Sequence, residues 1–195
     1  MDNSIKLHKY RYLEDLIMNY RKIELDSSNI YKKSELLLMQ IAKWHNLTPK
    51  LWIPDYKVTT AEIEETVLKI QNTRNEDLLL AVAEDELGHI QGFIWACKQE
   101  KSQDSVMILS LYVTENYRGQ GVATKLKKLL EEWCRLKGIK TIETTVHHKN
   151  NSMMELNQKL GYTPGMVYMT KNYKKYTLEE TKHNTKSREK SPKRT

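Results

Sequence analysis

The segment that most constrains the fold is a strand-like run that passes through a glycine turn into a helix-like run. Residues 106–113 read as an apolar strand, Gly119 and Gly121 follow closely, and residues 124–136 have helical spacing. The first amides of such a helix have no acceptor within it and carry the positive end of its macrodipole. Because Arg118 and Lys125 add positive charge on either side, this segment predicts a binding site for a phosphate group.

The spacing of the glycines excludes two common phosphate motifs. A dinucleotide fingerprint needs G-x-G-x-x-G, but Thr124 occupies the position of the third glycine. A P-loop needs G-x-x-x-x-G-K followed by Ser or Thr, but Gly121 is followed by Val122 and Ala123. The predicted phosphate site is therefore of another kind.

A second pattern lies downstream of the glycine turn. A β-branched run over residues 139–146 precedes a helix-like run. The residues that define the pattern across both runs are Val146, Asn150, Leu156, Gly161 and Tyr162. Together with R-G-x-G-V-A after a strand, this pattern resembles the GNAT superfamily of N-acetyltransferases. In that family the glycine turn binds the pyrophosphate of acyl-coenzyme A.

The resemblance implies a mixed α/β fold with a mostly antiparallel central sheet flanked by helices. The residue patterns predict strands over residues 5–8, 78–83, 90–97, 106–113, 139–146 and 166–173. They predict helices over residues 13–25, 34–44 and 124–136, one capped by Thr60, and one from Asn151. One domain is expected over residues 1–178, with a helical acceptor-side region at about 12–75.

The net charge of +7 is concentrated near the C-terminus. Residues 182–195 hold six Lys or Arg and one acid, which leaves a net charge of +2 on the preceding residues. This distribution does not favour a nucleic-acid partner. Residues 179–195 are expected to form a basic, disordered tail because residues 182–195 contain no Val, Ile, Leu or aromatic side chain.

The two cysteines and the lack of a long apolar stretch indicate where in the cell the protein is expected. Cys97 and Cys134 lie in apolar patterns without a metal-binding or redox spacing, which is typical of buried thiols in a reducing environment. No metal is expected. No stretch approaches the roughly 18 apolar residues that a membrane span needs. A cytoplasmic protein without membrane attachment is therefore expected, and a homodimer is left open.

The resemblance implies acetyl-coenzyme A as the acyl donor. Amides of the glycine turn would bind its pyrophosphate, and the backbone of the preceding strand would pair with the pantetheine arm. The residues implied in binding are Leu111, Tyr112, Val113, Arg118, Gly119, Gln120, Gly121, Val122, Ala123, Thr124, Asn150 and Asn157. For Asn150, the residue pattern equally predicts an Asx turn that caps the next helix.

The general acid departs from the family pattern. Alignment on Gly161 places Asn157 where the family usually has a tyrosine, and an amide cannot protonate a thiolate, whose conjugate acid has an ordinary pKa of about 8.5. Tyr112 and Tyr162 are the substitutes within the motifs. Of these, Tyr112 is the candidate catalytic residue, because Tyr162 also suits a packing position, and the acid stays unassigned. A free thiolate near that pKa could also leave without an acid.

The general base is not fixed by the pattern either. Residues 106–113 contain no carboxylate, so Glu84 at the end of a neighbouring strand is the expected base. Glu143, His147 and His148 are alternatives. Trp52, between two prolines, is the expected contact for an acceptor amine through its aromatic face.

Two function classes fit these residues. The first is an N-acetyltransferase that acts on a primary amine of a small molecule or a protein by direct attack within a ternary complex. The second is a coenzyme A-binding sensor or partner domain of the same fold without catalysis, which the replacement at Asn157 motivates. A nucleic-acid-associated enzyme that docks through the basic tail is a weaker third hypothesis.

Overall fold

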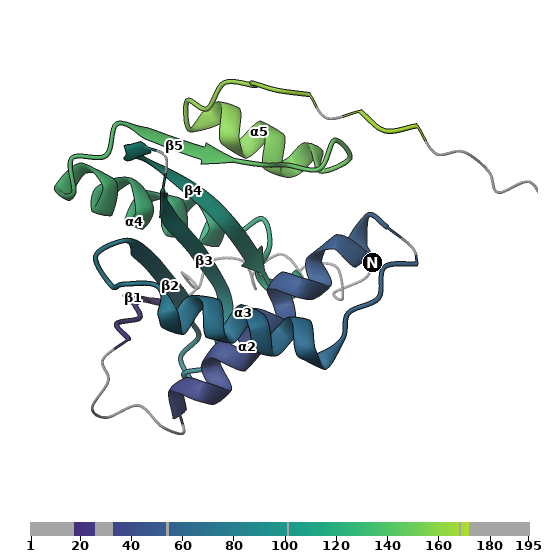
Figure 1. Cartoon of the computed structure of the whole chain (residues 1–195), viewed down its shortest axis with the longest axis vertical. Helices are drawn as coiled ribbons and strands as arrows, with labels where there is room; N and C mark the ends of the chain where they lie inside the picture. The colour runs from purple at the N-terminus through teal and green to yellow at the C-terminus, as the bar shows by residue number, and fades with distance from the viewer. Residues whose placement is uncertain (1–17, 26–32, 54, 101, 168, 172–195) are drawn as a thin grey trace, which may run out of the picture.

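The computed structural model describes residues 18–25, 33–53, 55–100, 102–167 and 169–171, and a five-stranded sheet lies at its centre (Figure 1). The strands lie in chain order: β1 (Asn19–Lys22), β2 (Leu78–Glu84), β3 (Ile90–Gln99), β4 (Ser102–Val113) and β5 (Thr141–Thr144). Strands β1 to β4 pair antiparallel, and β5 pairs parallel with β4. The mixed, mostly antiparallel sheet expected from the sequence is therefore confirmed.

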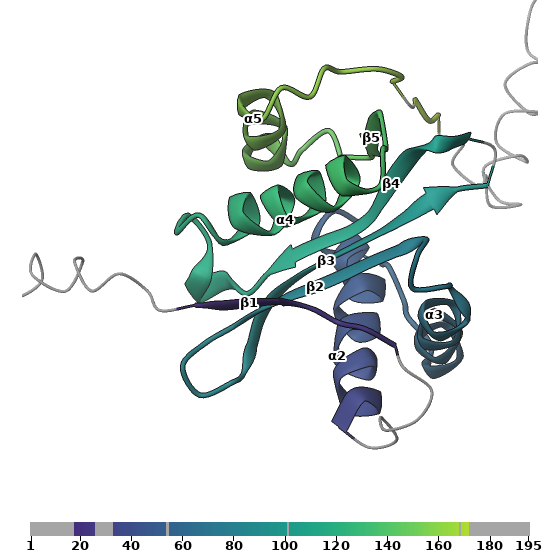
Figure 2. The same ribbon diagram turned by 90° about the vertical axis from the view of Figure 1, so that its left-hand side faces the viewer.

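Helices cover both faces of the sheet (Figure 2). Helices α2 (Lys33–Leu47) and α3 (Thr60–Asn72) pack on one face, and α4 (Val122–Leu136) packs on the other. Helix α5 (Asn151–Lys159) follows β5, and short 3-10 turns occupy Thr48–Leu51 and Glu115–Tyr117. Within the described ranges, no helix has the length and apolarity to cross a bilayer.

Side-chain alternation along β2 divides the core between the two faces. Leu78, Leu80 and Val82 pack in the cluster under α2 and α3, whereas Leu79 packs in the cluster under α4. This division follows from the period of two in a strand, which sends successive side chains to opposite faces. All six residues from Leu78 to Ala83 are buried, so β2 lies between helices on both sides.

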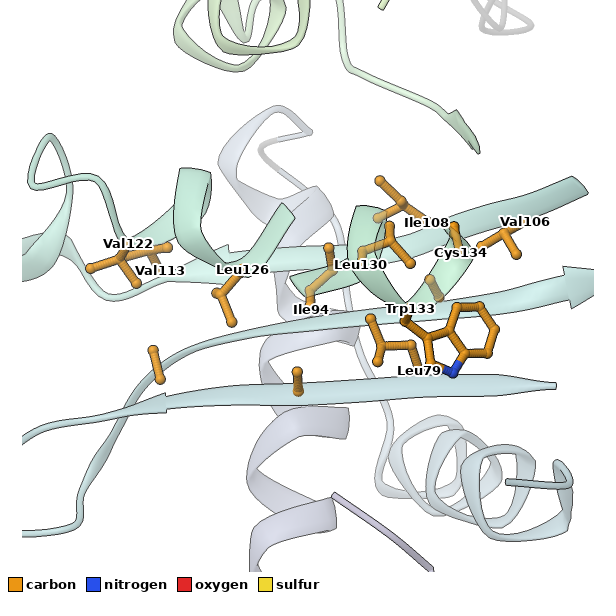
Figure 3. Packing of buried hydrophobic residues seen from close by; sticks show 13 residues of the cluster. Leu79, Ile94, Val106, Ile108, Val113, Val122, Leu126, Leu130, Trp133 and Cys134 are labelled. Carbon is orange, nitrogen blue, oxygen red and sulfur yellow. The ribbon is translucent and has the colours of Figure 1, made fainter. Parts of the chain in front are cut away.

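An apolar stripe fixes α4 against the sheet (Figure 3). The buried apolar residues of this stripe are Val122, Leu126, Leu130, Trp133 and Cys134. Full burial of one such large apolar side chain contributes about 1.5–3 kcal/mol. The stripe begins at the first residue of α4, so it also holds the preceding glycine turn at the end of β4.

Strand β4 carries an extra residue at Leu109. On β3, Trp95 pairs with Ser110 and Ala96 pairs with Ile108, so Leu109 forms a β-bulge. A bulge bends a strand and increases its local twist. Strand β5 pairs with β4 only as far as Ile108, so the two strands separate where the bulge begins.

Two predicted elements are wrong where the structure describes them. Within the predicted helix at residues 13–25, residues 19–22 form β1, because backbone pairing with β2 overrides the helical spacing. Within the predicted strand at residues 166–173, the described residues form no strand, and Met166 is 99% exposed. Without a neighbouring strand there is no ladder to support this apolar segment.

Other predictions differ from the structure in detail or concern residues outside the described ranges. The N-cap of α3 is Thr59 rather than Thr60, and it forms a capping box with Glu62. The predicted strand at residues 5–8 and the basic tail at residues 179–195 lie outside the described residues. Cys134 is buried and Cys97 half-buried, and both are free thiols, as expected.

Candidate functional site

The glycine turn after β4 has the backbone geometry that the sequence predicts. Gly119 has a φ of 74° and Gly121 a φ of 80°, in the left-handed region that favours glycine. A Cβ on Gly121 would have no atom within 4 Å, so the backbone angle rather than space requires glycine there. Gly121 is the N-cap of α4 and provides no side-chain cap, and the first helical bond runs from the Lys125 amide to the Gly121 carbonyl.

Charges around this turn favour an anion. The first turn of α4 contains no acidic residue, and both Arg118 and Lys125 are exposed beside it. The Nε of Arg118 donates a hydrogen bond of 2.9 Å to the carbonyl of Val113, which ties the turn to the end of β4. The Arg118 guanidinium also lies 5.8 Å from the centre of the Tyr112 ring. Amides of a helix start with cations beside them have the charge and the free donors that a phosphate requires.

A pocket of about 290 Å³ lies where β4 and β5 separate. Its walls come from β4 around the bulge, the segment after β5, the start of α5, one side of α4, and the end of α2 with the turn that follows. The lining residues are His45, Thr48, Pro49, Trp52, Ile53, Ile108, Leu109, Ser110, Leu111, Lys127, Thr144, Thr145, Val146, His147, Asn150 and Met153. The pocket therefore runs along the edge of β4 that β5 leaves unpaired.

One wall of the pocket is an aromatic stack. The rings of Trp52 and His147 are 5.1 Å apart and nearly parallel, at 12°. The Nδ1 of His147 accepts a hydrogen bond of 3.2 Å from the Lys149 amide, so the neutral imidazole carries its proton on Nε2. Desolvation, followed by the charges of His148 and Lys149, lowers the pKa of His147. His147 is therefore neutral at pH 7, with its Nε2 as hydrogen-bond donor.

His45 was not among the residues singled out from the sequence. It lies on α2, lines the pocket, and meets the Trp95 ring edge-on at 5.1 Å. Burial, followed by the charge of Lys69, lowers its pKa, so this imidazole is also neutral at pH 7. Nothing in the local sequence marks His45, because its place in the pocket results from the packing of α2 under β4.

Lys127 was also missed. Its side chain is 1% exposed, and its Nζ lies 4.2 Å from the centre of the Tyr162 ring. A helical spacing of three residues from Leu130 and seven from Cys134 places Lys127 on the buried stripe of α4. That spacing was a signal in the sequence, but the neighbouring charged residues favoured an exposed position.

Several predicted residues meet at this pocket. Leu111, Asn150 and Trp52 line it. Leu111 lies on β4, and the glycine turn follows this strand in the chain. The Oδ1 of Asn150 accepts a hydrogen bond of 3.2 Å from the Met153 amide. The cap of α5 that the residue pattern predicted is therefore present, and Asn150 lines the pocket as well.

The two expected catalytic residues lie elsewhere. The Tyr112 ring stacks on Trp44 at 4.9 Å, on the α2 face of the sheet, and is not among the lining residues. Glu84 is at the end of β2, where Arg21 Nε and Nη2 donate to its two carboxylate oxygens at 3.0 and 2.6 Å. Glu84 is absent from the described lining of the pocket too.

The remaining candidates are divided between buried and exposed positions. Asn157 is 6% exposed, and its Oδ1 has no hydrogen-bond partner among the described residues. Tyr162 packs against the α4 cluster, and burial, with smaller effects of Glu131 and Cys134, raises its pKa to about 12. The alternative bases Glu143 and His148 are exposed.

Comparison with known proteins identifies relatives by sequence. The sequence model of the Acetyltransferase (GNAT) family matches residues 40–162. The L-2,4-diaminobutyric acid acetyltransferase of Vibrio parahaemolyticus is 34% identical over 73 residues, which are 37% of this chain. The match spans 40% of the length of that relative, which is less than half of it.

Solved structures share the fold. Aminoglycoside N-acetyltransferase AAC(6′)-Iy, in complex with the bisubstrate analogue CoA-S-monomethyl-acetylneamine, superposes with a TM-score of 0.56 at 19% identity. That alignment covers 80% of this chain and 99% of the other. Glucosamine-6-phosphate N-acetyltransferase from Arabidopsis thaliana gives a TM-score of 0.52 at 18% identity, over 80% of this chain and 99% of the other.

Proposed function

The chain belongs to the GNAT acetyltransferase family, and from this we propose that it transfers the acetyl group of acetyl-coenzyme A to a primary amine of a small molecule. The amine attacks the thioester directly, within a ternary complex. The observation that carries the proposal is the presence of two features on one strand. Strand β4 separates from β5 at the Leu109 bulge, and the chain leaves β4 through a 3-10 turn into the glycine turn, Gly119–Gly121, at the start of α4.

The first step of the proposal is donor binding. The first amides of α4 bind the pyrophosphate, assisted by Arg118 and Lys125. The unpaired edge of β4 beyond Ile108 then presents backbone donors and acceptors to the amides of the pantetheine arm. A backbone amide near Leu111 would face the thioester carbonyl. Preorganised donors of this kind are worth about 3–4 kcal/mol in transition-state stabilisation.

The second step is acceptor binding at the aromatic wall. The stacked rings of Trp52 and His147 line the pocket, and an aromatic face there would suit an ammonium group. Among the described residues that line the pocket there is no Asp or Glu, so this face is the main attraction there for a cation. The relatives named above are acetyltransferases of diaminobutyric acid, an aminoglycoside and an amino-sugar phosphate, which supports a small amine as acceptor.

The third step is deprotonation of the acceptor, whose ammonium has an ordinary pKa of about 10.4. His45 and His147 are the described imidazoles in the pocket, and both are neutral at pH 7 because their pKa values are lowered. The Nδ1 of His147 already accepts a backbone hydrogen bond, so we assign the proton acceptor to His45. Glu84, the base expected from the sequence, is not part of this proposal because Arg21 binds its carboxylate outside the pocket.

A thiol-release assay with acetyl-coenzyme A and a panel of diamines, amino acids, amino sugars and aminoglycosides tests the proposal. Steady turnover with a small amine is expected, and Trp52→Ala should raise the KM for that amine without changing the KM for acetyl-coenzyme A. Trp52→Phe is the matched control, because it keeps a π-face. His45→Gln should lower kcat without preventing donor binding.

The same assay separates the two function classes. Asn157, at the position where the family usually has a tyrosine, is buried, and its Oδ1 has no hydrogen-bond partner among the described residues; this favours the second candidate, a coenzyme A-binding domain without catalysis. Binding of coenzyme A without turnover on any amine of the panel would support that candidate against the proposed transferase. Failure to bind coenzyme A would contradict both.

A further inference from the structure

Lys127 is a lysine in the buried stripe of α4. Its side chain is 1% exposed, and its Nζ has no hydrogen-bond partner among the described residues. The contact that the ammonium makes is with the Tyr162 ring, at 4.2 Å from the ring centre. Burial of an ammonium is strongly unfavourable unless other groups compensate it. Apolar packing alone therefore does not explain a lysine at this position.

Lys127 also lines the pocket. Within the described lining it is the only Lys or Arg, so it is the one ammonium or guanidinium group in the wall of the pocket itself. The Oη of Tyr162, on the ring that Lys127 contacts, also has no hydrogen bond among the described residues. Buried polar atoms are normally paired, so an unpaired ammonium on a side chain that lines a pocket indicates that a ligand supplies some of its bonds.

Acetyl transfer from a thioester requires a proton at the sulfur. When the carbon–sulfur bond breaks, the sulfur keeps the electron pair, and the resulting thiolate has a conjugate acid with an ordinary pKa of about 8.5. The amide of Asn157 has no proton to donate at neutral pH. The Tyr162 phenol, whose pKa burial raises to about 12, is too weak an acid to match a thiol.

We propose that Lys127 is the general acid of the reaction, and that its ammonium donates a proton to the departing coenzyme A sulfur. This inference rests on the proposed function. The acceptor nitrogen forms a bond to the thioester carbon, the carbon–sulfur bond breaks, and the sulfur takes a proton from Nζ. Lys127 is left as a neutral amine. The acceptor ammonium gives its first proton to His45, and through it to solvent, before the attack; its second proton leaves the nitrogen as the amide forms, and solvent carries a proton back to Lys127.

The acidity of Lys127 suits this role. Burial lowers the pKa of its ammonium to about 8, against a smaller opposing effect of Glu131 on the same helix. General acids work best when their pKa is near that of the group they protonate and near the working pH. Among the described residues, the other titratable groups on the buried stripe of α4, at the ring that Lys127 contacts and in the pocket lining are Cys134, Tyr162, His147 and His45. The two imidazoles are neutral above pH 7, and burial raises the pKa of Cys134 to about 11.

The first experiment measures the pKa of the coenzyme A thiol in the complex, from the ultraviolet absorbance of the thiolate during a pH titration. An ammonium near the sulfur should lower the thiol pKa by about one unit relative to free coenzyme A. In Lys127→Met the thiol pKa should return to that of free coenzyme A. Lys128→Met, which removes an exposed charge from the next position of α4, should leave the lowered pKa unchanged.

The second experiment measures the rate. With a small amine as acceptor, Lys127→Met should lower kcat by about a hundredfold, the lower end for general acids because a thiolate is already a good leaving group. The KM for acetyl-coenzyme A should stay unchanged. The wild-type kcat should fall as pH rises through the pKa of Lys127, and this alkaline limb should be absent in Lys127→Met. A merely structural lysine would not produce this pH profile.

The outcomes separate this inference from the proposed function. If coenzyme A binds and amines are acetylated, but the thiol pKa is the same in the wild type and Lys127→Met, only the role of Lys127 is overturned. If mass spectrometry finds the acetyl group on Nζ of Lys127 after turnover, the lysine is an acceptor rather than an acid, which also overturns it. If the wild type does not bind coenzyme A, both proposals fail.

Discussion

Replacement of Lys127 with methionine is expected to stabilise the protein at neutral pH. Methionine fills a similar volume without a charge, and the buried ammonium is the main cost at this position. Burial lowers the pKa of Lys127 from 10.5 to about 8. At about 1.4 kcal/mol for each pH unit, this difference corresponds to about 3 kcal/mol. Loss of the contact with Tyr162 offsets part of it, by about 1 kcal/mol.

The expected gain depends on pH in a defined direction. The folded-state pKa, about 8, is below the unfolded-state value of 10.5, so below pH 8 both states carry the charge and the folded state bears the full cost. Between about pH 8 and 10.5 the unfolded state binds more protons, so the stability of the wild type rises with pH. The advantage of Lys127→Met should therefore be greatest near pH 7 and disappear towards pH 10.5.

Thermal and urea unfolding at pH 7 and pH 10 measure this effect. A net gain of about 2 kcal/mol in the free energy of unfolding raises the Tm by about 4–8 °C in a chain of this size. Lys128→Met, at an exposed position of the same helix, should change neither value. If Lys127→Met were less stable than the wild type at pH 7, or if its gain were the same at both pH values, the electrostatic argument would be refuted.

Three further predictions concern the glycine turn at Gly121, the N-cap of α3 at Thr59 and the carboxylate of Glu84. Gly121→Glu should abolish coenzyme A binding in calorimetry, because it places a negative charge at the start of α4. The control is Gly88→Ala, at a comparable φ of 76° in the β2–β3 turn, which should reduce stability but not the affinity for coenzyme A. Retained affinity in Gly121→Glu would contradict the phosphate site. Thr59→Ala should lower the free energy of unfolding by about 1 kcal/mol in urea titrations through loss of the α3 cap, while Thr60→Ala should have little effect. Glu84→Gln should leave kcat at pH 7 unchanged, and a large loss of kcat with intact folding would restore Glu84 as the base.

Local sequence signals predicted the parts of the site that local geometry determines. Gly119 and Gly121 have positive φ values that few other residues adopt, and Asn150 caps a helix within three residues of itself. Strands β2 and β3 alternate or run apolar as their burial requires. In each case the residues that carry the signal also make the contact, so the pattern and the structure agree.

The missed features depend on register and packing between distant segments. The bulge at Leu109 is a property of how β3 and β4 align, which no period within either strand encodes. Strand β1 was missed because its conformation is fixed by pairing with β2, about sixty residues away. Lys127 was missed because a lysine is usually exposed, and only the contacts of α4 with Tyr162 show that this one is not.

The edge of β4 that β5 leaves unpaired beyond Ile108 also affects the stability of the protein in the cell. An open strand edge can template the addition of another extended chain, and proteins usually protect such edges. In the proposed complex the pantetheine arm covers this one. The free protein should then be more prone to self-association and proteolysis than the complex, since a ligand that binds only the folded state stabilises it by mass action. The abundance of this enzyme would therefore follow the supply of acetyl-coenzyme A, without any dedicated regulatory site.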